Sequence, residues 1–444
     1  MRNAGKKRRL QRRNLMANDG LVRFDMKKYP IRQRWFLRPI TWLVSYPNIW
    51  LRHLKIKRSG VEGLKPPYLL LCTHHAFIDF MVTTAAIFPH RANYVVALDG
   101  FIRREWLLRN VGGICKRKFT HDLTMIRHMK RVIDNGDILA LYPEARYSQI
   151  GTTAVLPDSL GKVARFLGAP VAMLNMHGNY LSSPCWNLSK RKLPLSADFT
   201  RILTAEETKS LPLDEINQRI RDAFAYDEYR WQKENMIRIT HRENARGLHK
   251  VLYQCPACRT EYRMNSAGLR LWCEHCGKSW KLSDLGELTA ENGQTEYSHL
   301  PDWYEFQRAE VRKQIENGVY EFSDEVDIDS LPNARGYINL GKGRLTHNRN
   351  GFTLESELPV AALPLHKTPA TMYSCHIEYD YDARGDCIVL STLDDTYYIY
   401  PRNIKNCVTK VALATEELFS WNQLHRPAAG PARPDNFASI TAAR

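Results

Sequence analysis

Short apolar runs alternate with stretches of helical spacing through the first half of the chain. The runs cover residues 68–72, 93–98, 138–142 and 170–174, and helices are expected at 77–88, 101–110, 121–135, 158–168 and 212–229. A short run that is apolar at every position is typical of a strand buried on both faces. The pattern therefore predicts an α/β domain over residues 67–235, with a mixed or parallel sheet covered by helices.

Beyond residue 300 the pattern changes to one of hairpins. A helix is expected at 301–317, strands at 335–340, 352–358, 373–381, 387–390 and 396–400, and a last helix at 415–423. Hairpins closed by one carboxyl-terminal helix predict a β-rich domain over 300–425, which resembles a pleckstrin-homology-like barrel by pattern alone. The Pro- and Ala-rich segment 426–444 is expected to be disordered.

Two Cys-x2-Cys pairs lie between these domains. Cys255 and Cys258 are followed, after fourteen residues, by Cys273 and Cys276. Each pair places two thiolates on one tight turn, and two such turns complete a tetrahedral site for Zn²⁺. We therefore predict a zinc ribbon over residues 250–285 with a structural zinc ion. Redox chemistry is the alternative, but it does not explain why the pairs come as a couple.

Positive charge is concentrated at the amino-terminal end. The 444 residues carry a net charge of +17, and residues 1–60 alone contain 17 Lys and Arg against 2 Asp and Glu. The rest of the chain is therefore close to neutral. A basic arm on a neutral body favours a local anionic surface over an extended nucleic-acid groove, so nucleic acid is not the expected partner.

Residues 33–51 are rich in aromatic side chains flanked by arginines. Three tryptophans and a tyrosine lie here, at Trp35, Trp42, Tyr46 and Trp50. This composition predicts that residues 1–66 are a basic arm with an amphipathic segment at an anionic membrane surface. Pro39 and Pro47 are expected to break the segment into two pieces. An ordinary core layer against the α/β domain, or an RNA-binding arm, are the alternatives.

The chain shows no predicted transmembrane helix and no secretory signal. No apolar run reaches about 18 residues, and the basic start leads into no apolar core. The cysteines are better interpreted as thiols and ligands than as a disulfide framework. The expected location is the cytoplasm, with peripheral attachment to the inner face of the cell membrane.

The candidate chemistry begins at the end of the first apolar run. His74 and His75 follow that run at the edge where open α/β sheets place their ligands. Asp79 comes five residues after His74, and a carboxylate at this place can orient an imidazole that acts as a general base. The alternative is a histidine pair that only caps the strand. The spacing alone is common by chance, so its context must decide.

Four short blocks occur in a fixed order around this pair. They cover residues 73–79, 111–118, 141–148 and 169–172. Their order and spacing resemble the glycerolipid acyltransferase family, the 1-acyl-sn-glycerol-3-phosphate or lysophospholipid acyltransferases. In that family a His-x4-Asp block precedes a Gly-containing block that ends in Arg, a Pro-Glu-Gly-Thr-Arg-Ser block and an apolar strand with Pro.

The resemblance implies a transfer reaction and its substrates. An acyl group would move from acyl-CoA or an acyl-carrier protein to the hydroxyl of a lysophospholipid- or glycerophosphate-type acceptor. His74 would be the general base and Asp79 would orient its ring. The implied partners are therefore an anionic membrane surface, the thioester donor, which includes an acyl-carrier protein, and the lysophospholipid-type acceptor.

The second and third blocks would hold the acceptor's polar head. That role falls to Arg117 or Lys118 and to Arg146, which would bind an anionic group through charge-assisted hydrogen bonds. Glu144 would order this basic site or bind an acceptor hydroxyl. A surface cluster of ion pairs is the alternative for these residues.

This sequence departs from the family pattern at several positions. Thr73 stands where Asn is usual, Ala145 replaces Gly, and Arg146 lies one residue early. Two classes of function therefore remain. One is a membrane-surface acyltransferase, which the intact His74 and Asp79 favour. The other is a catalytically degenerate protein that binds lipid or nucleic acid through the zinc ribbon and the basic arm, which the altered third block favours.

Overall fold

The structure is a computed structural model that describes residues 20–360 and 362–425. The predictions for the basic tip of the arm, residues 1–19, and for the tail, residues 426–444, fall outside these ranges. None of the helices within them is both long enough and apolar enough to span a bilayer.

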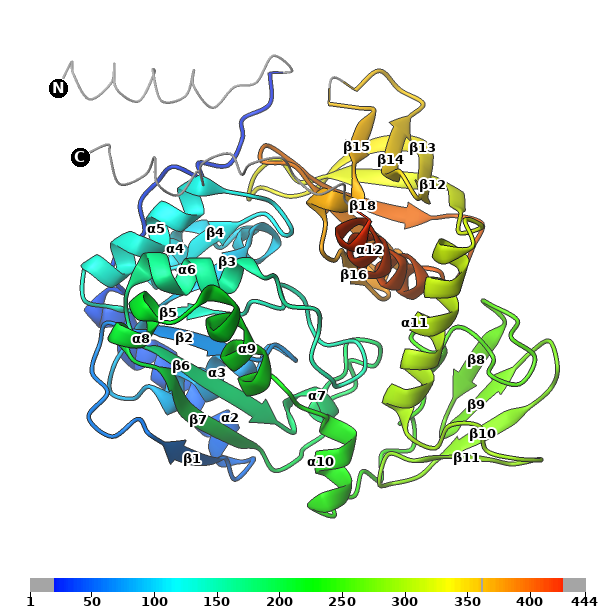
Figure 1. Ribbon diagram of the computed structural model, residues 1–444, viewed down its shortest axis with the longest axis horizontal. Helices are drawn as coiled ribbons and strands as arrows, with labels where there is room; N and C mark the ends of the chain where they lie inside the picture. Colours follow the sequence, from blue (N-terminus) through cyan, green and yellow to red (C-terminus); the bar gives the residue numbers. More distant parts are fainter. Residues whose placement is uncertain (1–19, 361, 426–444) are drawn as a thin grey trace.

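The first half of the chain is built on a seven-stranded sheet in the order β1-β7-β6-β2-β5-β3-β4 (Figure 1). Its strands are β1 (Lys55–Ser59), β2 (Leu69–Cys72), β3 (Ala92–Ala97), β4 (Ile114–Lys116), β5 (Ile138–Leu141), β6 (Val171–His177) and β7 (Ser196–Leu203). Neighbours from β6 to β4 are parallel, whereas β7 runs antiparallel to β6 and parallel to β1. The predicted mixed sheet is therefore present.

Helices pack on both faces of this sheet, α5 (Leu123–Asp134), α6 (Ser159–Leu167) and α9 (Leu213–Ala223) on one face and α3 (Asp79–Ala86) on the other. This part of the chain also contains α4 (Glu105–Asn110), α7 (Asn179–Ser182), α8 (Ala205–Ser210), α10 (Glu228–Glu234) and the 3-10 turn η2 (Leu98–Phe101). The predicted helix 212–229 is interrupted, because Asp227 accepts a hydrogen bond from the Arg230 N–H and caps a new helix there.

Strand β2 is buried on both faces of the sheet, which explains its unbroken apolar sequence. Leu69 and Leu71 pack with α5, α6 and α9 on one face of the sheet. Leu70 and Cys72 point to the other face and pack with α2 (Arg38–Trp50) and α3. Since successive side chains of a strand alternate between its two faces, each residue of β2 meets a buried layer. This central strand delivers His74 to the carboxyl edge of the sheet.

The aromatic segment of the arm forms one helix instead of the two pieces predicted. The 3-10 turn η1 (Trp35–Leu37) leads into the 13-residue helix α2, which contains both prolines. Pro39 lies in the first turn, where its missing N–H has no helical partner, and Pro47 lies near the end. The helix packs against α3 with Ile49, but leaves most of its large apolar side chains exposed. These are Ile40, Leu43, Val44, Tyr46 and Trp50.

A four-stranded antiparallel sheet follows the α/β part, in the order β11-β10-β9-β8. Its strands are β8 (Met264–Ala267), β9 (Arg270–Cys273), β10 (Ser279–Leu282) and β11 (Leu288–Ala290), preceded by the turn η3 (Leu248–Lys250). The two Cys-x2-Cys turns lie at one end of it. Trp280 of this sheet packs edge-on against Trp303 of α11 (Leu300–Glu316), so the small sheet shares a core with the next part of the chain.

The carboxyl-terminal part is a seven-stranded antiparallel sheet in the order β15-β14-β13-β12-β18-β17-β16. Its strands are β12 (Phe322–Ser330), β13 (Ile338–Asn348), β14 (Gly351–Ser356), β15 (Leu365–Lys367), β16 (His376–Glu378), β17 (Cys387–Ser391) and β18 (Thr396–Pro401). The helix α12 (Val408–Leu424) and the turns η4 (Pro369–Thr371) and η5 (Tyr381–Ala383) complete it. The predicted β-rich domain with a closing helix is thus present. Among the described residues its edge strands β15 and β16 do not pair, so the sheet stays open.

Several elements of this part differ from the prediction. Strand β15 was not predicted, and β13 extends to Asn348, eight residues beyond the predicted strand. Strand β12 was not predicted, because its sequence is rich in acidic residues. One of them, Asp324, is buried and accepts hydrogen bonds from the backbone N–H groups of Asn403 and Ile404. Helix α12 begins at Val408, seven residues before the predicted start. Its first eleven residues are all buried between the sheet and α11, so no polar face marked them.

The α/β and carboxyl-terminal parts are joined by a continuous core. Leu98 and Phe101 pack together with Leu331, Val389 and Tyr398. The beginning of the described chain lies on the same junction. The Phe24 N–H donates to the carbonyl of Pro332 at 3.0 Å, and the Asn333 side chain donates to the carbonyl of Val22 at 2.7 Å. The amino-terminal segment is therefore fastened to residues more than three hundred positions away.

Candidate active site

The predicted pair meets at the carboxyl end of β2. His74 Nδ1 lies 3.1 Å from Asp79 Oδ2, and Asp79 is the first residue of α3. The same Oδ2 accepts from the backbone N–H groups of His75 and Ala76, at 2.6 and 3.0 Å. Oδ1 accepts from Asn179 Nδ2 at 2.8 Å. The turn between the strand and the helix therefore closes around this carboxylate.

These contacts decide the ionisation of Asp79. Burial opposes its charged form, but the hydrogen bonds from His74 and Asn179 and the two neighbouring imidazoles hold the pKa of the Asp79 carboxyl below its ordinary value. Asp79 is therefore a carboxylate at neutral pH. A carboxylate only accepts hydrogen bonds, so the His74 ring carries its proton on Nδ1.

The opposite ring nitrogen of His74 is left for a substrate. Within the described ranges Nε2 has no hydrogen-bond partner, and the His74 side chain is 26% exposed. Tyr142 and Tyr147 lie beside the ring, with centroids 4.6 and 4.5 Å from that of His74. A partly exposed imidazole with a free ring nitrogen, backed by a buried carboxylate, has the arrangement of a general base.

Glu144 holds the backbone of His74 in place. Its Oε2 accepts from the His74 N–H at 2.8 Å, and its Oε1 accepts from Ala154 N–H and the Tyr226 hydroxyl at 2.9 and 3.1 Å. Burial raises the pKa of Glu144 to about 7. The backbone N–H of Ser148 also donates to the His74 carbonyl at 2.9 Å. The loop after β5 therefore clamps His74 on both sides, and Glu144 is a positioning residue more than an acceptor ligand.

The departure at Ala145 has a backbone consequence. This residue adopts a φ of +56°, in the left-handed region that glycine occupies without a steric penalty. A glycine would adopt this turn without strain, whereas Ala145 adopts it at a steric cost.

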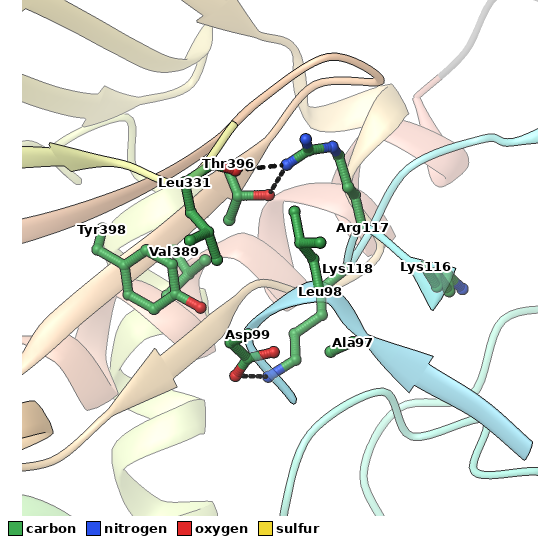
Figure 2. A pocket seen from close by; sticks show the side chains of 10 residues that line it. All are labelled: Ala97, Leu98, Asp99, Lys116, Arg117, Lys118, Leu331, Val389, Thr396 and Tyr398. Atoms are coloured by element: carbon green, nitrogen blue, oxygen red, sulfur yellow. Dashed lines mark hydrogen bonds and ion pairs between the residues drawn. The ribbon is translucent and has the colours of Figure 1, made fainter. Parts of the chain in front are cut away.

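Arg117 is engaged by the carboxyl-terminal part. Its Nη1 donates to the Leu331 carbonyl and to Thr396 Oγ1, both at 2.9 Å. Its Nη2 donates to the carbonyls of Pro332 and Asp394 at 2.8 and 2.9 Å. Figure 2 shows this guanidinium turned toward Thr396. The residue is buried, and the head-group role implied for it finds no support in this geometry.

Arg146, in the loop that clamps His74, is also held by side chains and backbone of the carboxyl-terminal part. Its Nη2 is paired with Glu416 of α12, and both side chains are buried. Its Nη1 donates to the carbonyl of Cys375 at 3.5 Å. Glu416 also receives hydrogen bonds from Ser374 Oγ and Arg308 Nη1, each at 2.7 Å. The loop that clamps His74 is thus anchored on α12, and the head-group role implied for Arg146 stays a prediction.

Lys118 lies in a group of polar side chains at the junction. Its Nζ is 2.7 Å from His376 Nε2 and 3.9 Å from Asp99 Oδ2. Figure 2 shows Lys118 and Asp99 facing each other beside a hollow whose other wall includes Val389 and Tyr398. The head-group role implied for Lys118 stays a prediction.

The four predicted zinc ligands do come together. The Sγ atoms of Cys255, Cys258, Cys273 and Cys276 all lie within 4.8 Å of one another, the span of a tetrahedral thiolate set. Cys255 and Cys273 are buried, whereas Cys276 is exposed. The donor set therefore fits a divalent ion such as zinc, held in a closed structural site.

Sequence reasoning missed several residues of the candidate site. Asn179, which binds Asp79, has no motif around it and lies one hundred positions along the chain. Tyr142 and Tyr147 lie inside the third block but were not singled out, although two aromatic residues flanking the Pro-Glu pair were visible in the sequence. His376 and Glu378 come from another part of the fold and carried no signal.

The comparisons with known proteins are sparse. No family model matches the chain, and no curated protein does either. Among solved structures, the crystal structure of the 1-acyl-sn-glycerophosphate (LPA) acyltransferase of Thermotoga maritima aligns with 43% of this chain and 77% of that chain. The sequence identity is 13% and the TM-score 0.36. This likeness is distant and does not determine a function.

Proposed function

We propose that the protein transfers an acyl group from a thioester to a hydroxyl of a lipid-type acceptor, with His74 as the general base. The observation that carries this proposal is the His74–Asp79 pair, in which Nδ1 is held by a buried carboxylate and Nε2 is open. The ordered blocks around the pair support the same reaction class.

The steps follow from this geometry. His74 Nε2 takes the proton of the acceptor hydroxyl while its oxygen attacks the thioester carbonyl. Asp79 stabilises the imidazolium that forms, without taking the proton itself. When the tetrahedral intermediate collapses, the carbon–sulfur bond breaks and the imidazolium returns the proton to the leaving thiolate. The products are the ester and the free thiol. Positioned base catalysis of this kind contributes about 10²–10⁴-fold.

The proposal also specifies a donor and an acceptor. Acyl-CoA or an acyl-carrier protein would supply the thioester, and the resemblance implies a lysophospholipid- or glycerophosphate-type hydroxyl as the acceptor. The chemistry at His74 requires a hydroxyl and a thioester, but it does not choose the polar head beside the hydroxyl.

The exposed face of α2 supports a membrane surface as the partner. Trp50 is 85% exposed and Leu43 is 74% exposed on this helix, and Arg38 stacks over Trp42 beside them. An apolar helix face with flanking arginines is typical of helices that lie in a bilayer interface. We propose that the protein attaches peripherally to the cytoplasmic face of the cell membrane through this face, which would bring a lipid acceptor to the enzyme.

One observation favours a second candidate, a lipid-binding protein without catalysis. Arg117 and Arg146 are held by the carboxyl-terminal part, so two predicted substrate ligands do not face the candidate site. The intact pair of His74 and Asp79 opposes this candidate, because a protein that only binds does not need an oriented base.

The deciding experiment is thiol release from acyl-CoA and from acyl-carrier protein over a panel of lipid hydroxyls. We expect acceptor-dependent release by the wild type and a loss of at least about 10²-fold in His74→Ala. His90→Ala, an exposed histidine away from the pair, is the matched control. Equal release by His74→Ala and His90→Ala, or none by the wild type, would leave the binding protein as the better interpretation.

A further inference from the structure

The reaction proposed for His74 needs a second group besides the base. Attack on the thioester carbonyl moves negative charge onto the carbonyl oxygen, and a hydrogen-bond donor fixed at that place stabilises the tetrahedral intermediate. In this reaction the attacking oxygen lies at His74 Nε2 and bonds to the carbonyl carbon. The donor is therefore expected on a residue that lies next to the His74 ring.

The backbone N–H groups of the turn before α3 are already used within the fold. The N–H of His74 donates to Glu144 Oε2 at 2.8 Å, and those of His75 and Ala76 donate to Asp79 Oδ2 at 2.6 and 3.0 Å. A turn that leads into a helix could otherwise offer such donors to an anion. Here they serve the carboxylates that position the base, so a side chain is the better source of the missing hydrogen bond.

Two polar side chains of the surrounding elements are engaged as well. Arg146 is paired with a buried carboxylate of α12. The Tyr142 ring lies 4.6 Å from that of His74 between centroids, and its hydroxyl is 3.1 Å from Thr83 Oγ1. Thr83 donates its own proton to the Asp79 carbonyl at 2.8 Å, so Tyr142 is the donor in the contact between them. The proton of Tyr142 is therefore already in use.

Tyr147 is the second tyrosine that packs on the His74 ring. Their centroids are 4.5 Å apart at an interplanar angle of 53°, and Tyr147 is partly exposed. Within residues 20–360 and 362–425 its hydroxyl has no hydrogen-bond partner. Burial raises the pKa of this hydroxyl, and the Asp79 carboxylate raises it further. The phenol therefore keeps its proton at neutral pH and can donate it in a hydrogen bond to a substrate.

The loop after β5 fixes Tyr147 beside the base. The residue before it, Arg146, is paired with Glu416, and both side chains are buried. The residue after it, Ser148, donates from its backbone N–H to the His74 carbonyl at 2.9 Å. A donor held between two such contacts needs little reorganisation when charge develops on a substrate, and this preorganisation is what makes oxyanion stabilisation effective.

We infer that the Tyr147 hydroxyl donates a hydrogen bond to the thioester carbonyl oxygen and stabilises the oxyanion of the tetrahedral intermediate. This inference rests on the proposed function of His74. The phenol keeps its proton throughout, because the hydrogen bond strengthens as the carbonyl electrons move to oxygen and weakens when the double bond re-forms. The carbon–sulfur bond breaks in that second step, and the imidazolium supplies the proton of the leaving thiol. Tyr147 is thus a catalytic residue of the same reaction, with a role distinct from that of the base.

Tyr147→Phe tests this inference, because it removes the hydroxyl and keeps the ring that packs on His74. We expect kcat for thiol release from acyl-CoA to fall by about 10²-fold, with KM within about threefold of the wild type. The second donor is the matching dithioester, in which a sulfur that accepts hydrogen bonds weakly replaces the carbonyl oxygen. With this donor the loss should be about threefold or less, since there is little hydrogen bond to lose.

Tyr142→Phe is the matched comparison. It removes a hydroxyl that donates to Thr83, so any loss that it causes should be equal for the two donors. An equal loss for both donors in Tyr147→Phe would mean that this hydroxyl serves the structure of the site, and would overturn the inference. So would a kcat of Tyr147→Phe within about threefold of the wild type, whereas the proposed function would stand as long as His74→Ala is inactive.

Binding of a tetrahedral mimic separates the inference from the proposed function when no turnover is seen. A long-chain trifluoromethyl ketone forms a hydrate with the geometry of the intermediate, and calorimetry measures its affinity. We expect binding to the wild type to be at least about tenfold tighter than to Tyr147→Phe. This result would support the inference even if the wild type releases no thiol. Equal binding by the two proteins, or none by either, would overturn it.

Discussion

Asp79 is satisfied on both carboxylate oxygens before any substrate arrives. Two backbone N–H groups, the Asn179 amide and the His74 ring all donate to it. A side chain held so firmly fixes the direction of the imidazole that it contacts. The cost of changing it should therefore appear in the chemical step and not in substrate binding.

Asp79→Asn is the substitution that tests this. Its amide oxygen would take the place of Oδ2, where two backbone N–H groups need an acceptor, so the ring keeps its tautomer but loses the negative charge that stabilises the imidazolium. We expect kcat to fall by about 10²–10⁴-fold with KM within a few-fold of the wild type. Steady-state kinetics measure both. Activity within twofold of the wild type would show that the charge of Asp79 does not limit the reaction.

Glu144 gives a prediction about stability and pH. Its folded pKa of about 7 lies above the 4.5 of an ordinary glutamate. Between these values the folded chain binds a proton that the unfolded chain does not. Its contribution to the free energy of unfolding therefore falls as the pH rises toward 7, by about 3 kcal/mol in total, and is constant above.

Glu144→Gln cannot titrate, so its stability should fall less than that of the wild type between pH 5 and pH 7. Urea unfolding at several pH values measures the difference. Parallel curves for the two proteins would mean that the carboxyl is charged throughout this range.

At the residue scale, the sequence predicted those residues of the candidate site that lie within one short block. His74 and Asp79 lie five residues apart on one turn, so a local motif could identify them. The fate of Arg117 and Arg146 could not be predicted in this way, because their partners lie more than two hundred residues away. A motif records that an arginine is present but not which group it contacts.

At the scale of elements, α2 presents more apolar surface to solvent than to its own core. We expect Leu43→Glu combined with Trp50→Glu to lower binding to anionic vesicles by at least about tenfold, because burying each such side chain contributes about 1.5–3 kcal/mol. Co-sedimentation with vesicles of phosphatidylglycerol measures this. Val319→Glu, an equally exposed site after α11, is the control. Equal binding by the double variant and the control would exclude α2 as the attachment site.

Disruption of the small cysteine-bearing sheet should also destabilise the core that it shares with α11. Trp280 packs on Trp303, and Gln307 of α11 hydrogen-bonds to the backbone at Gln254, next to the first cysteine. We expect removal of the metal by a chelator, or Cys258→Ser, to lower Tm by about 5 °C or more. Cys407→Ser, a buried cysteine outside the four-cysteine cluster, separates metal loss from the loss of a thiol. An unchanged Tm in the chelator would show that this sheet is stable without an ion.

Periodicity predicted the elements that are buried on two faces and those that alternate cleanly. β2, β3, β5 and β6 all appear close to their predicted bounds. It failed where burial and polarity disagree. The acidic residues of β12 gave no strand pattern, and the start of α12 gave no helical pattern because its first turns are buried on all sides. The sequence predicts a break at Pro47, but the helix continues through it to Trp50, and the proline removes only one backbone donor.

At the scale of the whole molecule, the contact of Arg146 with Glu416 links the loop that clamps His74 to α12. Glu416→Gln leaves the buried Arg146 and the partly buried Arg308 with a weaker partner, so we expect the free energy of unfolding to fall by about 3 kcal/mol. At temperatures well below Tm, kcat should fall while KM changes little, because the loop that clamps His74 loses its anchor.

Glu417→Gln is the matched control for this prediction. Glu417 lies next along α12 and pairs with Arg312 and Arg308, but it does not touch the loop. A loss of stability with normal kcat in Glu416→Gln would show that the anchor serves the fold alone. Contacts of this range, 270 positions apart, are set by how the domains pack and leave no periodic trace in either segment.

The fastening of the amino-terminal segment has a consequence for the newly made chain. Residues 22–24 leave the ribosome long before their hydrogen-bonding partners Pro332 and Asn333. At about 5–20 residues per second, roughly 15 seconds or more of translation separate the two. The loop that holds His74 waits longer still, for Glu416. A nascent chain therefore completes its α/β sheet well before Glu416 is made and the loop that holds His74 gains its anchor.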